Sequence, residues 1–332
     1  MRRSAGLLAV VIGMTLVGFT FAEHLFSRSA DARTVADHYA PLMSRAGLDD
    51  LSSGFAAVQH AGAQLDTEAE PQLQRALGMD DGEFAAYKAR EMPGIAAFDA
   101  QAGAVVKLVG PVIGQMRAER ADYARASDIP VSWLPLSSAP WLFLGIGALL
   151  LAVGGFALAR PGARASAALL VVGLGVVIAP LVVGIPGKVD AAIRVTKIGR
   201  VGLAPSTAQR AVGATKLFDG MVRDVQTKLA PAVDGESGAG TFSSRFETLD
   251  GFATTWQRST SAKSHALSDS QVAMGPTFAN ADKIPLRPIP WLFIGPGLAL
   301  SLLAGAALVA STRRSTATVL DLGSGGVLLT NK

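Results

Sequence analysis

Four stretches of the chain contain no charged residue and no histidine. They cover Ala5–Ala22, Trp141–Ala159, Ala165–Ile185 and Trp291–Ala310. An α-helix needs ~20 residues to cross a ~30 Å hydrocarbon core, and each stretch is close to that length. Because the apolar residues form continuous runs and do not recur with amphipathic spacing, the pattern predicts transmembrane helices and argues against a soluble enzyme.

Basic residues flank these stretches and predict their orientation. They are Arg2 and Arg3 before the first, Arg160 and Arg164 between the second and third, and Arg313 and Arg314 after the fourth. Since basic residues next to membrane helices stay on the cytoplasmic side, both termini and the turn 160–164 are predicted to be cytoplasmic. Residues 23–140 and 186–290 are then predicted to lie outside. Trp133, Trp141 and Trp291 stand at the outer ends of spans, where indole rings anchor helices at the membrane interface.

The first span has two interpretations. Arg2–Arg3, the apolar run and the small-residue pattern Thr20-Phe21-Ala22 are also features of a cleavable signal peptide. The apolar core from Ala5 to Phe21 is longer than the usual ~7–15 residues of such a peptide, which favours an uncleaved anchor. Cleavage remains the alternative.

The sequence contains an internal repeat. Pro140-Trp141-Leu142-Phe143-Leu144-Gly145-Ile146-Gly147 recurs 150 positions later as Pro290-Trp291-Leu292-Phe293-Ile294-Gly295-Pro296-Gly297. A weaker match at an offset of 162 relates the first span to the third. The prediction is an all-α membrane protein with four transmembrane helices in two parallel repeats, each a span, a helical ectodomain and a second span.

The predicted segments follow from these boundaries. They are transmembrane helix 1 at 1–22, ectodomain 1 at 23–140, helix 2 at 141–159, a turn at 160–164, helix 3 at 165–185, ectodomain 2 at 186–290, helix 4 at 291–310 and a tail at 311–332. In ectodomain 1, Asp80 with Glu83 three residues later is typical of a capping box. In ectodomain 2, apolar residues from Val212 to Leu229 recur every three or four positions, which predicts an amphipathic helix.

The charge of the chain is divided unevenly among these segments. The 332 residues are 50% hydrophobic and carry a net charge of +4. Segment 23–140 has 10 Lys and Arg against 16 Asp and Glu, and segment 186–290 has 13 against 9. The cytoplasmic pieces have 7 against 1, so the basic balance reflects membrane orientation and excludes a nucleic-acid footprint.

Residues that carry chemistry are few. The chain has no cysteine, and its four histidines are not paired at metal-binding spacing on a helix. Asp49-Asp50 and Asp80-Asp81 lack the alternating ligands of a calcium loop. The tail segment Val319–Gly326 resembles a glycine-rich methyltransferase motif, but six residues cannot complete the sheet that this motif needs. The prediction is no catalytic residue, no metal and no cofactor.

Small residues and prolines distinguish the spans. Gly155, Gly297 and Gly305 take part in four-residue spacings of small side chains that permit close helix packing. Pro180 and Pro296 are expected to bend the third and fourth spans. An oligomer interface or a lipid-binding groove is the alternative interpretation of the small residues.

These observations favour a non-enzymatic, multi-pass protein of a bacterial cytoplasmic membrane. Arginine outnumbers lysine 21 to 9, as in GC-rich bacteria. The duplicated ectodomains are expected to act as an interaction module, scaffold or accessory subunit of an envelope complex. The expected partners are membrane lipids and a protein subunit or a second copy of the chain, with no nucleic acid. Binding or transport of a lipid or hydrophobic solute is the first alternative, and a sensor that signals through a partner is the second.

Overall fold

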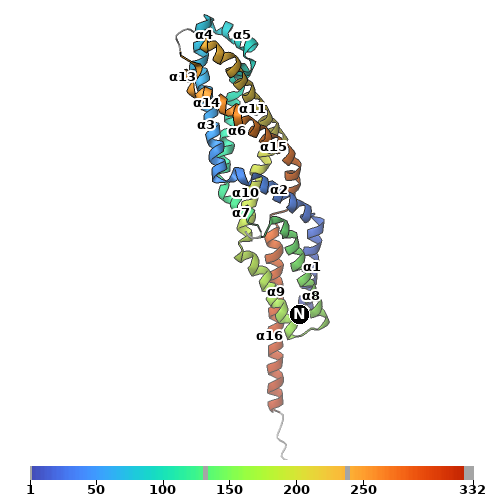
Figure 1. Cartoon of the computed structure of the whole chain (residues 1–332). Coiled ribbons are helices and arrows are strands. Elements are labelled where there is room, and N and C mark those ends of the chain that lie inside the picture. The colour runs from blue at the N-terminus through green and yellow to red at the C-terminus, as the bar shows by residue number, and fades with distance from the viewer. Residues whose placement is uncertain (1, 130–133, 236–239, 325–332) are drawn as a thin grey trace, which may run out of the picture. The chain divides into compact units, whose positions relative to one another are not determined.

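The computed structural model describes residues 2–129, 134–235 and 240–324, with side chains described between 3 and 310 (Figure 1). Every regular element in these ranges is a helix, and no strand occurs in them. The predicted all-α class is therefore confirmed. By Cα proximity the chain divides into two units. Unit 1 comprises 1–33, 124–193 and 280–332, and unit 2 comprises 34–123 and 194–279.

Within the part of the chain that the structure describes, five helices are long and apolar enough to cross a membrane, where the sequence patterns predicted four. They cover Arg3–Ala22, Pro93–Ala118, Leu136–Ala159, Ala163–Val182 and Ile289–Ala310. The additional helix, Pro93–Ala118, has a mean hydropathy of 1.3, against 2.1 to 2.5 for the other four. Asp99 and Lys107 interrupt its apolar run, which is why the search for uncharged stretches placed it in ectodomain 1.

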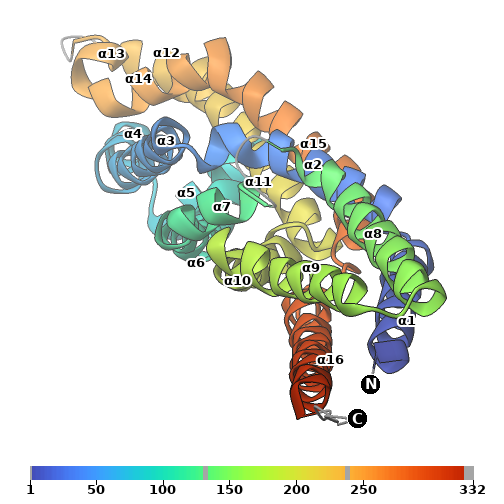
Figure 2. The same ribbon diagram turned by 90° about the horizontal axis from the view of Figure 1, so that it is seen from below.

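Unit 1 contains two antiparallel helix pairs. Helix α1 (Arg2–Ala22) packs along α8 (Ala139–Ala159), and α9 (Ala163–Val182) packs along α16 (Ile289–Ser324) (Figure 1). Figure 2 shows the same four helices from below. Gly6 faces Gly154 and Gly13 faces Gly147, and a Cβ atom on Gly13 would lie 2.7 Å from the carbonyl oxygen of Gly147. Because these glycines carry no side chain, the two helix backbones approach closely.

The second pair repeats this arrangement. A Cβ atom on Gly173 of α9 would lie 3.2 Å from the carbonyl oxygen of Gly297 on α16. The rings of Phe143 and Phe293, from the two matching sequence segments, are 4.9 Å apart between centroids. Both rings belong to one buried apolar cluster that draws on α1, α8, α9 and α16. The four helices therefore share one core.

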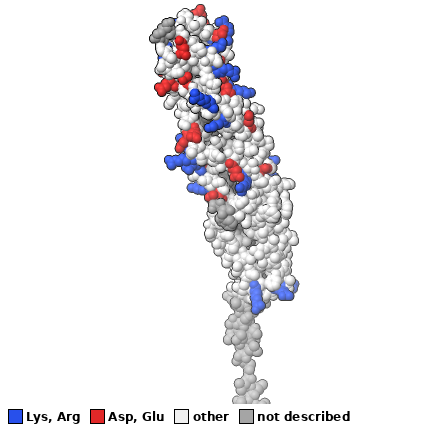
Figure 3. All heavy atoms as spheres, viewed as in Figure 1, with Lys and Arg blue, Asp and Glu red and all other residues white. Residues whose placement is uncertain are grey.

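The four apolar helices of unit 1 carry no charged side chain along their middle, and basic residues adjoin one end of them. The visible face of unit 1 in Figure 3 is uncharged along the helices and carries basic residues at one end. Because α1 and α8 are antiparallel, the start of α1, the end of α8 and the start of α9 lie at the same end. Arg3, Arg160 and Arg164 adjoin those points.

Unit 2 is built from two chain segments with similar element order. The first gives α3 (Arg45–Gln64), the π-helix η1 (Leu65–Ala69), α4 (Glu70–Leu77), α5 (Asp81–Glu91) and α6 (Pro93–Ala118). The second gives α11 (Pro205–Asp224), the π-helix η3 (Val225–Leu229), α12 (Ala230–Asp234), α13 (Phe242–Arg245), α14 (Glu247–Thr255) and the π-helix η4 (Trp256–Thr260). Four further α-helices contribute residues to both units: α2 (Leu25–Met43), α7 (Arg120–Ser127), α10 (Ile185–Gly202) and α15 (Ser261–Ala281). The short 3₁₀ helix η2 (Leu136–Ser138) precedes α8.

Local sequence signals explain several helix ends. Asp80 accepts a hydrogen bond from the Glu83 N–H, and the Glu83 side chain accepts one from the Asp80 N–H, so the predicted capping box is confirmed. Helix α5 then ends at Glu91, and α6 begins at Pro93, which needs no N–H partner at a helix start. Helix α6 continues through Pro111.

The two segments of unit 2 cap each other's helices crosswise. Helix α6 packs on α11, and α14 packs on α3. Asp224, at the end of α11, accepts hydrogen bonds from the N–H groups of Gly94 (2.5 Å) and Ile95 (3.2 Å) at the start of α6. Gln64, at the end of α3, accepts one from Leu249 N–H (2.8 Å) at the start of α14. Gln64 and Asp224 are 160 positions apart.

Other paired features occur at similar spacing. The π-helices η1 and η3 start 160 positions apart, at Leu65 and Val225. Met92 (φ −130°, ψ 58°) separates α5 from α6, and Phe246 (φ −125°, ψ 53°) separates α13 from α14. In unit 1, His24 and Gly184 share a positive φ, 48° and 74°, and they also lie 160 positions apart. Matched backbone conformations thus recur along the chain.

Candidate functional site

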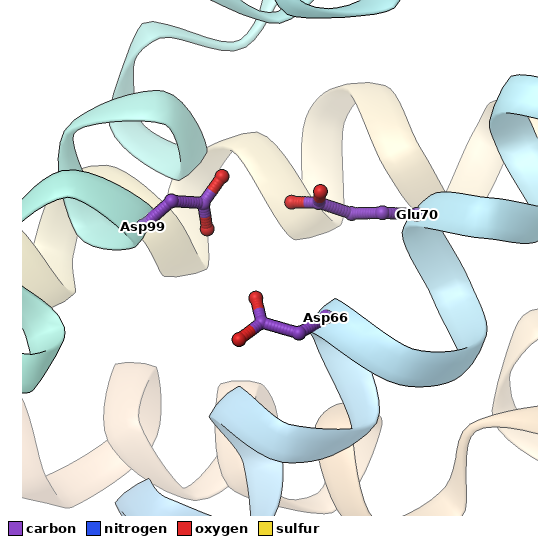
Figure 4. A group of neighbouring side chains, drawn as sticks. All are labelled: Asp66, Glu70 and Asp99. Atoms are coloured by element: carbon purple, nitrogen blue, oxygen red, sulfur yellow. The ribbon is translucent and has the colours of Figure 1, made fainter. Parts of the chain in front are cut away.

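Three carboxylates and one ammonium group form a cluster in unit 2, here called the acidic pocket. Asp66 lies on η1, Glu70 begins α4, Lys88 lies on α5 and Asp99 lies on α6. Figure 4 shows the carboxylates of Asp66, Glu70 and Asp99 turned toward a common space. One oxygen atom from each lies within 4.8 Å of the others.

Lys88 is the basic partner of this cluster. Its Nζ donates to Glu70 Oε2 at 2.5 Å and to Asp99 Oδ2 at 2.6 Å, and it lies 5.5 Å from the centre of the Phe84 ring. With all four groups ionised, three negative charges face one positive charge. The pocket therefore carries an excess of negative charge.

The environment changes the pKa values of the cluster. Burial raises the pKa of Glu70 to about 7, and the nearby charges of Asp99 and Asp66 add to this effect, while the hydrogen bond from Lys88 opposes it. Burial also raises the pKa of Asp66, again with a contribution from Asp99. Burial lowers the pKa of Lys88, but hydrogen bonds to Asp99 and Glu70 outweigh it and the net shift is upward. The carboxylates are thus under mutual repulsion.

Glu70 has one oxygen atom without a partner. The residue is 8% exposed, and its Oε1 is shielded from solvent and accepts no hydrogen bond within the described structure. Leaving a buried acceptor unsatisfied costs about 1–3 kcal/mol, and more for a charged group. An acceptor in this position is open to a ligand.

Asp66, Glu70 and Lys88 of the acidic pocket line a cavity of about 230 Å³. Its lining comes from η1, α4 and α5, and consists of Asp66, Glu70, Pro71, Gln74, Asp81, Phe84, Ala85 and Lys88. Gln74 Nε2 donates to Asp81 Oδ1 at 2.8 Å, which fixes the rim of the cavity. This volume holds several water molecules or a small hydrated ion.

A second polar centre in unit 2 surrounds Asp219 of α11. Its carboxylate accepts hydrogen bonds from Trp256 Nε1 (2.8 Å) and Ser261 Oγ (2.7 Å), and lies 2.6 Å from His265 Nε2. The Ser261 hydroxyl donates to the carboxylate and not to the imidazole. Serine activation in a catalytic triad requires the hydroxyl to donate to the imidazole, so this geometry favours a structural role.

No match was found between this chain and any known protein-family model, curated protein or solved structure.

The Asp219 centre predicts a specific acid sensitivity. Burial raises the pKa of Asp219, but hydrogen bonds from Ser261, Trp256 and His265 outweigh it and hold the pKa below its usual 3.8. A carboxyl with a depressed pKa stabilises the fold fully above 3.8, and this stabilisation is lost as the pH falls through the lower, folded-state pKa. Asp219→Asn removes the titrating group. We expect thermal midpoints at pH 6 and pH 3 to differ less in this variant than in the wild type, and an equal difference would contradict the assignment.

The predicted interface tryptophans are placed as follows. Trp141 and Trp291 are 65% and 69% exposed near the starts of α8 and α16. The Trp141 ring contacts Phe26 edge-on, with 5.1 Å between centroids. Trp133 lies outside the described residues.

The predicted packing and kink residues differ in their surroundings. A Cβ atom on Gly297 would lie 2.7 Å from Val177 Cγ2, whereas one on Gly305 would make an ordinary contact with Leu170 at 3.9 Å. A Cβ atom on Gly155 would meet no atom within 4 Å. Pro180 and Pro296 lie inside α9 and α16. Of the three glycines, only Gly297 lies in a tight helix contact within this chain.

No pattern in the sequence singled out the acidic pocket. The acidic pairs that suggested calcium, Asp49-Asp50 and Asp80-Asp81, are neighbours in sequence, and no metal ligand was predicted. Asp66 and Glu70 are four positions apart on adjoining helical turns and therefore share a face, which was a usable signal. Asp99 and Lys88 join them only through the packing of α5 and α6.

Proposed function

We propose that the chain is a multi-pass protein of a bacterial cytoplasmic membrane in which α1, α8, α9 and α16 are the four spans. Both termini and the turn 160–164 are then cytoplasmic, and unit 2 lies outside. The collection of Arg3, Arg160 and Arg164 at one end of the spans supports this orientation. Helix α6 belongs to the outer unit, since it carries Asp99, in an ion pair with Lys88, and Lys107.

We further propose that the chain is an internal duplication of span, helical ectodomain and span. The reciprocal caps by Gln64 and Asp224, the matched π-helices and the matched positive φ of His24 and Gly184 support it. Buried residues of the first and third spans correspond at an offset of 160: Ala5 and Ala165 are both buried, and so are Leu16 and Val176. The weaker sequence match has an offset of 162, which differs by two residues. Because each residue turns a helix by about 100°, that match would align faces of the two helices that point about 200° apart.

The proximity of the two phenylalanines allows a direct test of the shared membrane core. In the cysteine-free chain, Phe143→Cys and Phe293→Cys should be linked within one molecule by a short bifunctional thiol reagent. Phe143→Cys with Leu302→Cys is the matched control, since Leu302 is 73% exposed. Electrophoresis after proteolysis between the halves reads out the link. Equal cross-linking of both pairs would contradict the shared core.

The function that this architecture supports best is a non-enzymatic interaction module, scaffold or accessory subunit of an envelope complex. The observation that carries this proposal is the core of unit 2, a single apolar cluster to which both chain segments contribute. Phe98, Phe218 and Trp256 meet in its centre, with ring centroids 5.9 Å and 5.1 Å apart. Such a core makes a rigid body whose outer surface is available for contacts.

Native mass spectrometry of the full chain, purified gently from its own membrane, tests this function. We expect a protein subunit or a second copy of the chain to co-purify at fixed stoichiometry. A Gly94→Leu variant, in which unit 2 is disrupted and the spans are unchanged, should lose the partner and keep its surrounding lipid. A stoichiometric lipid with no protein partner would overturn the proposal in favour of lipid or hydrophobic-solute binding.

A further inference from the structure

We propose that the acidic pocket is a binding site for a hard divalent cation, with Ca²⁺ the best fit, held by Asp66, Glu70 and Asp99. This inference concerns only unit 2 and is independent of the proposed interaction role.

The spacing of the oxygen atoms fits a cation. Ca²⁺ binds oxygen ligands at about 2.3–2.6 Å, so ligands on opposite sides of the ion are about 5 Å apart and adjacent ligands are closer. Oxygen atoms of Asp66, Glu70 and Asp99 lie within 4.8 Å of one another and face a common space (Figure 4).

The unpartnered oxygen of Glu70 points independently to a ligand. Glu70 is 8% exposed as a residue and 11% exposed in its side chain; its Oε1 makes no hydrogen bond within the described residues, whereas its Oε2 is held by Lys88. A bound cation would satisfy this oxygen and offset the cost of burying it. The adjoining cavity of about 230 Å³ can hold the water molecules that complete the coordination.

Lys88 acts as the resident counterion in the absence of a metal. Its ammonium group contacts two of the three carboxylates and leaves an uncompensated charge of about −2. The side chain has a flexible four-carbon stem, so it can withdraw from Glu70 when a divalent ion enters. Ca²⁺ and the Lys88 ammonium therefore compete for the same oxygen atoms.

The second segment of unit 2 shows that the fold does not require these carboxylates. The π-helices η1 and η3 are 160 positions apart, so the counterparts of Asp66 and Glu70 are Gln226 and Ala230. The helices that follow Met92 and Phe246 are 154 positions apart, so the counterpart of Asp99 is Ala253. The same π-helical backbone forms there without any acidic residue. The cluster is thus a feature of the first segment alone.

The donor set selects the class of cation. The three donors are carboxylates, with no histidine or cysteine among them, and Zn²⁺ favours nitrogen and sulfur ligands. Mg²⁺ demands near-ideal octahedral geometry, whereas Ca²⁺ tolerates irregular positions and a mixture of carboxylates and water. The pocket takes its donors from three separate elements, η1, α4 and α6, so we expect it to bind the ion that tolerates irregular positions.

Isothermal titration of the full chain in detergent with CaCl₂ at pH 8 tests the site. We expect one Ca²⁺ per chain, a weakening of about tenfold or more in Asp66→Asn and in Glu70→Gln, and tighter binding in Lys88→Met, where the competing ammonium is gone. Glu68→Gln is the matched control, because Glu68 is exposed on the same π-helix and lies outside the cluster. Circular dichroism establishes that each variant is folded.

Three results would overturn the proposal. They are no heat of Ca²⁺ binding in the wild type, equal weakening in Glu68→Gln and Asp66→Asn, or Lys88→Met binding no more tightly than the wild type. Mg²⁺ added in excess should displace Ca²⁺ only weakly. Strong displacement would contradict the preference for Ca²⁺.

Discussion

Replacing Gly94 by alanine is expected to lower the free energy of unfolding of unit 2 by about 3 kcal/mol. A Cβ atom at this position would overlap the carbonyl group of Gly220 and lie 2.8 Å from Asp224 Oδ2. Forcing atoms into a packed contact costs about 1–3 kcal/mol, and separating α6 from α11 also removes the hydrogen bonds that Asp224 accepts from Gly94 and Ile95.

The control for this prediction lies on the same helix. A Cβ atom on Gly103 would meet no atom within 4 Å. Gly103→Ala should therefore raise stability by about 0.5–1 kcal/mol, the usual gain in a helix interior. Hydrogen-exchange protection of amides in α6 and α11 measures both effects. Equal protection in the two variants would show that the close contact of Gly94 with α11 is not required.

The second large effect is expected in unit 1 at Gly13. Valine at this position would meet the carbonyl oxygen of Gly147 at 2.7 Å and Leu151 Cγ at 2.9 Å, so α1 and α8 would have to separate. Because helix association in a membrane depends on close van der Waals packing, we expect a loss of about 2–3 kcal/mol. A lower thermal midpoint in detergent measures it.

Gly18→Val on the same helix is the matched control. A Cβ atom on Gly18 would meet nothing within 4 Å, so this variant should keep the wild-type midpoint. Losses of equal size in both variants would indicate that valine weakens α1 itself. The close packing of α1 against α8 would then not account for the loss of stability.

Local signals account for the parts of the fold that the sequence predicted. Uncharged runs are enough to locate four apolar helices, because about twenty consecutive apolar residues must be buried in a membrane or in the core of a large protein. The capping box of Asp80 and Glu83 is likewise a local signal, since its residues are three positions apart. Helix α6 shows the limit of this reasoning: two charged residues in an apolar run leave its assignment open from composition alone.

Contacts between distant segments account for the parts that could not be predicted. The caps by Gln64 and Asp224 are made to amide groups 185 and 130 positions away, and nothing in either local sequence indicates them. The acidic pocket has the same origin, because Asp99 reaches Glu70 through the packing of α6. Gly155 and Gly297 look alike in sequence, yet only Gly297 meets a neighbouring helix closely.

Labelling of introduced cysteines in intact cells with an impermeant maleimide is the most direct test of four spans with unit 2 outside the cytoplasm. Ser53 and Ser127 are exposed and lie on either side of α6 in the sequence, and Ala163 is exposed at the first residue of α9, next to the turn that follows α8. We expect Ser53→Cys and Ser127→Cys to react in intact cells, and Ala163→Cys to react only after permeabilisation. Reaction of Ala163→Cys in intact cells, or labelling of Ser53→Cys and Ser127→Cys from opposite sides, would contradict it.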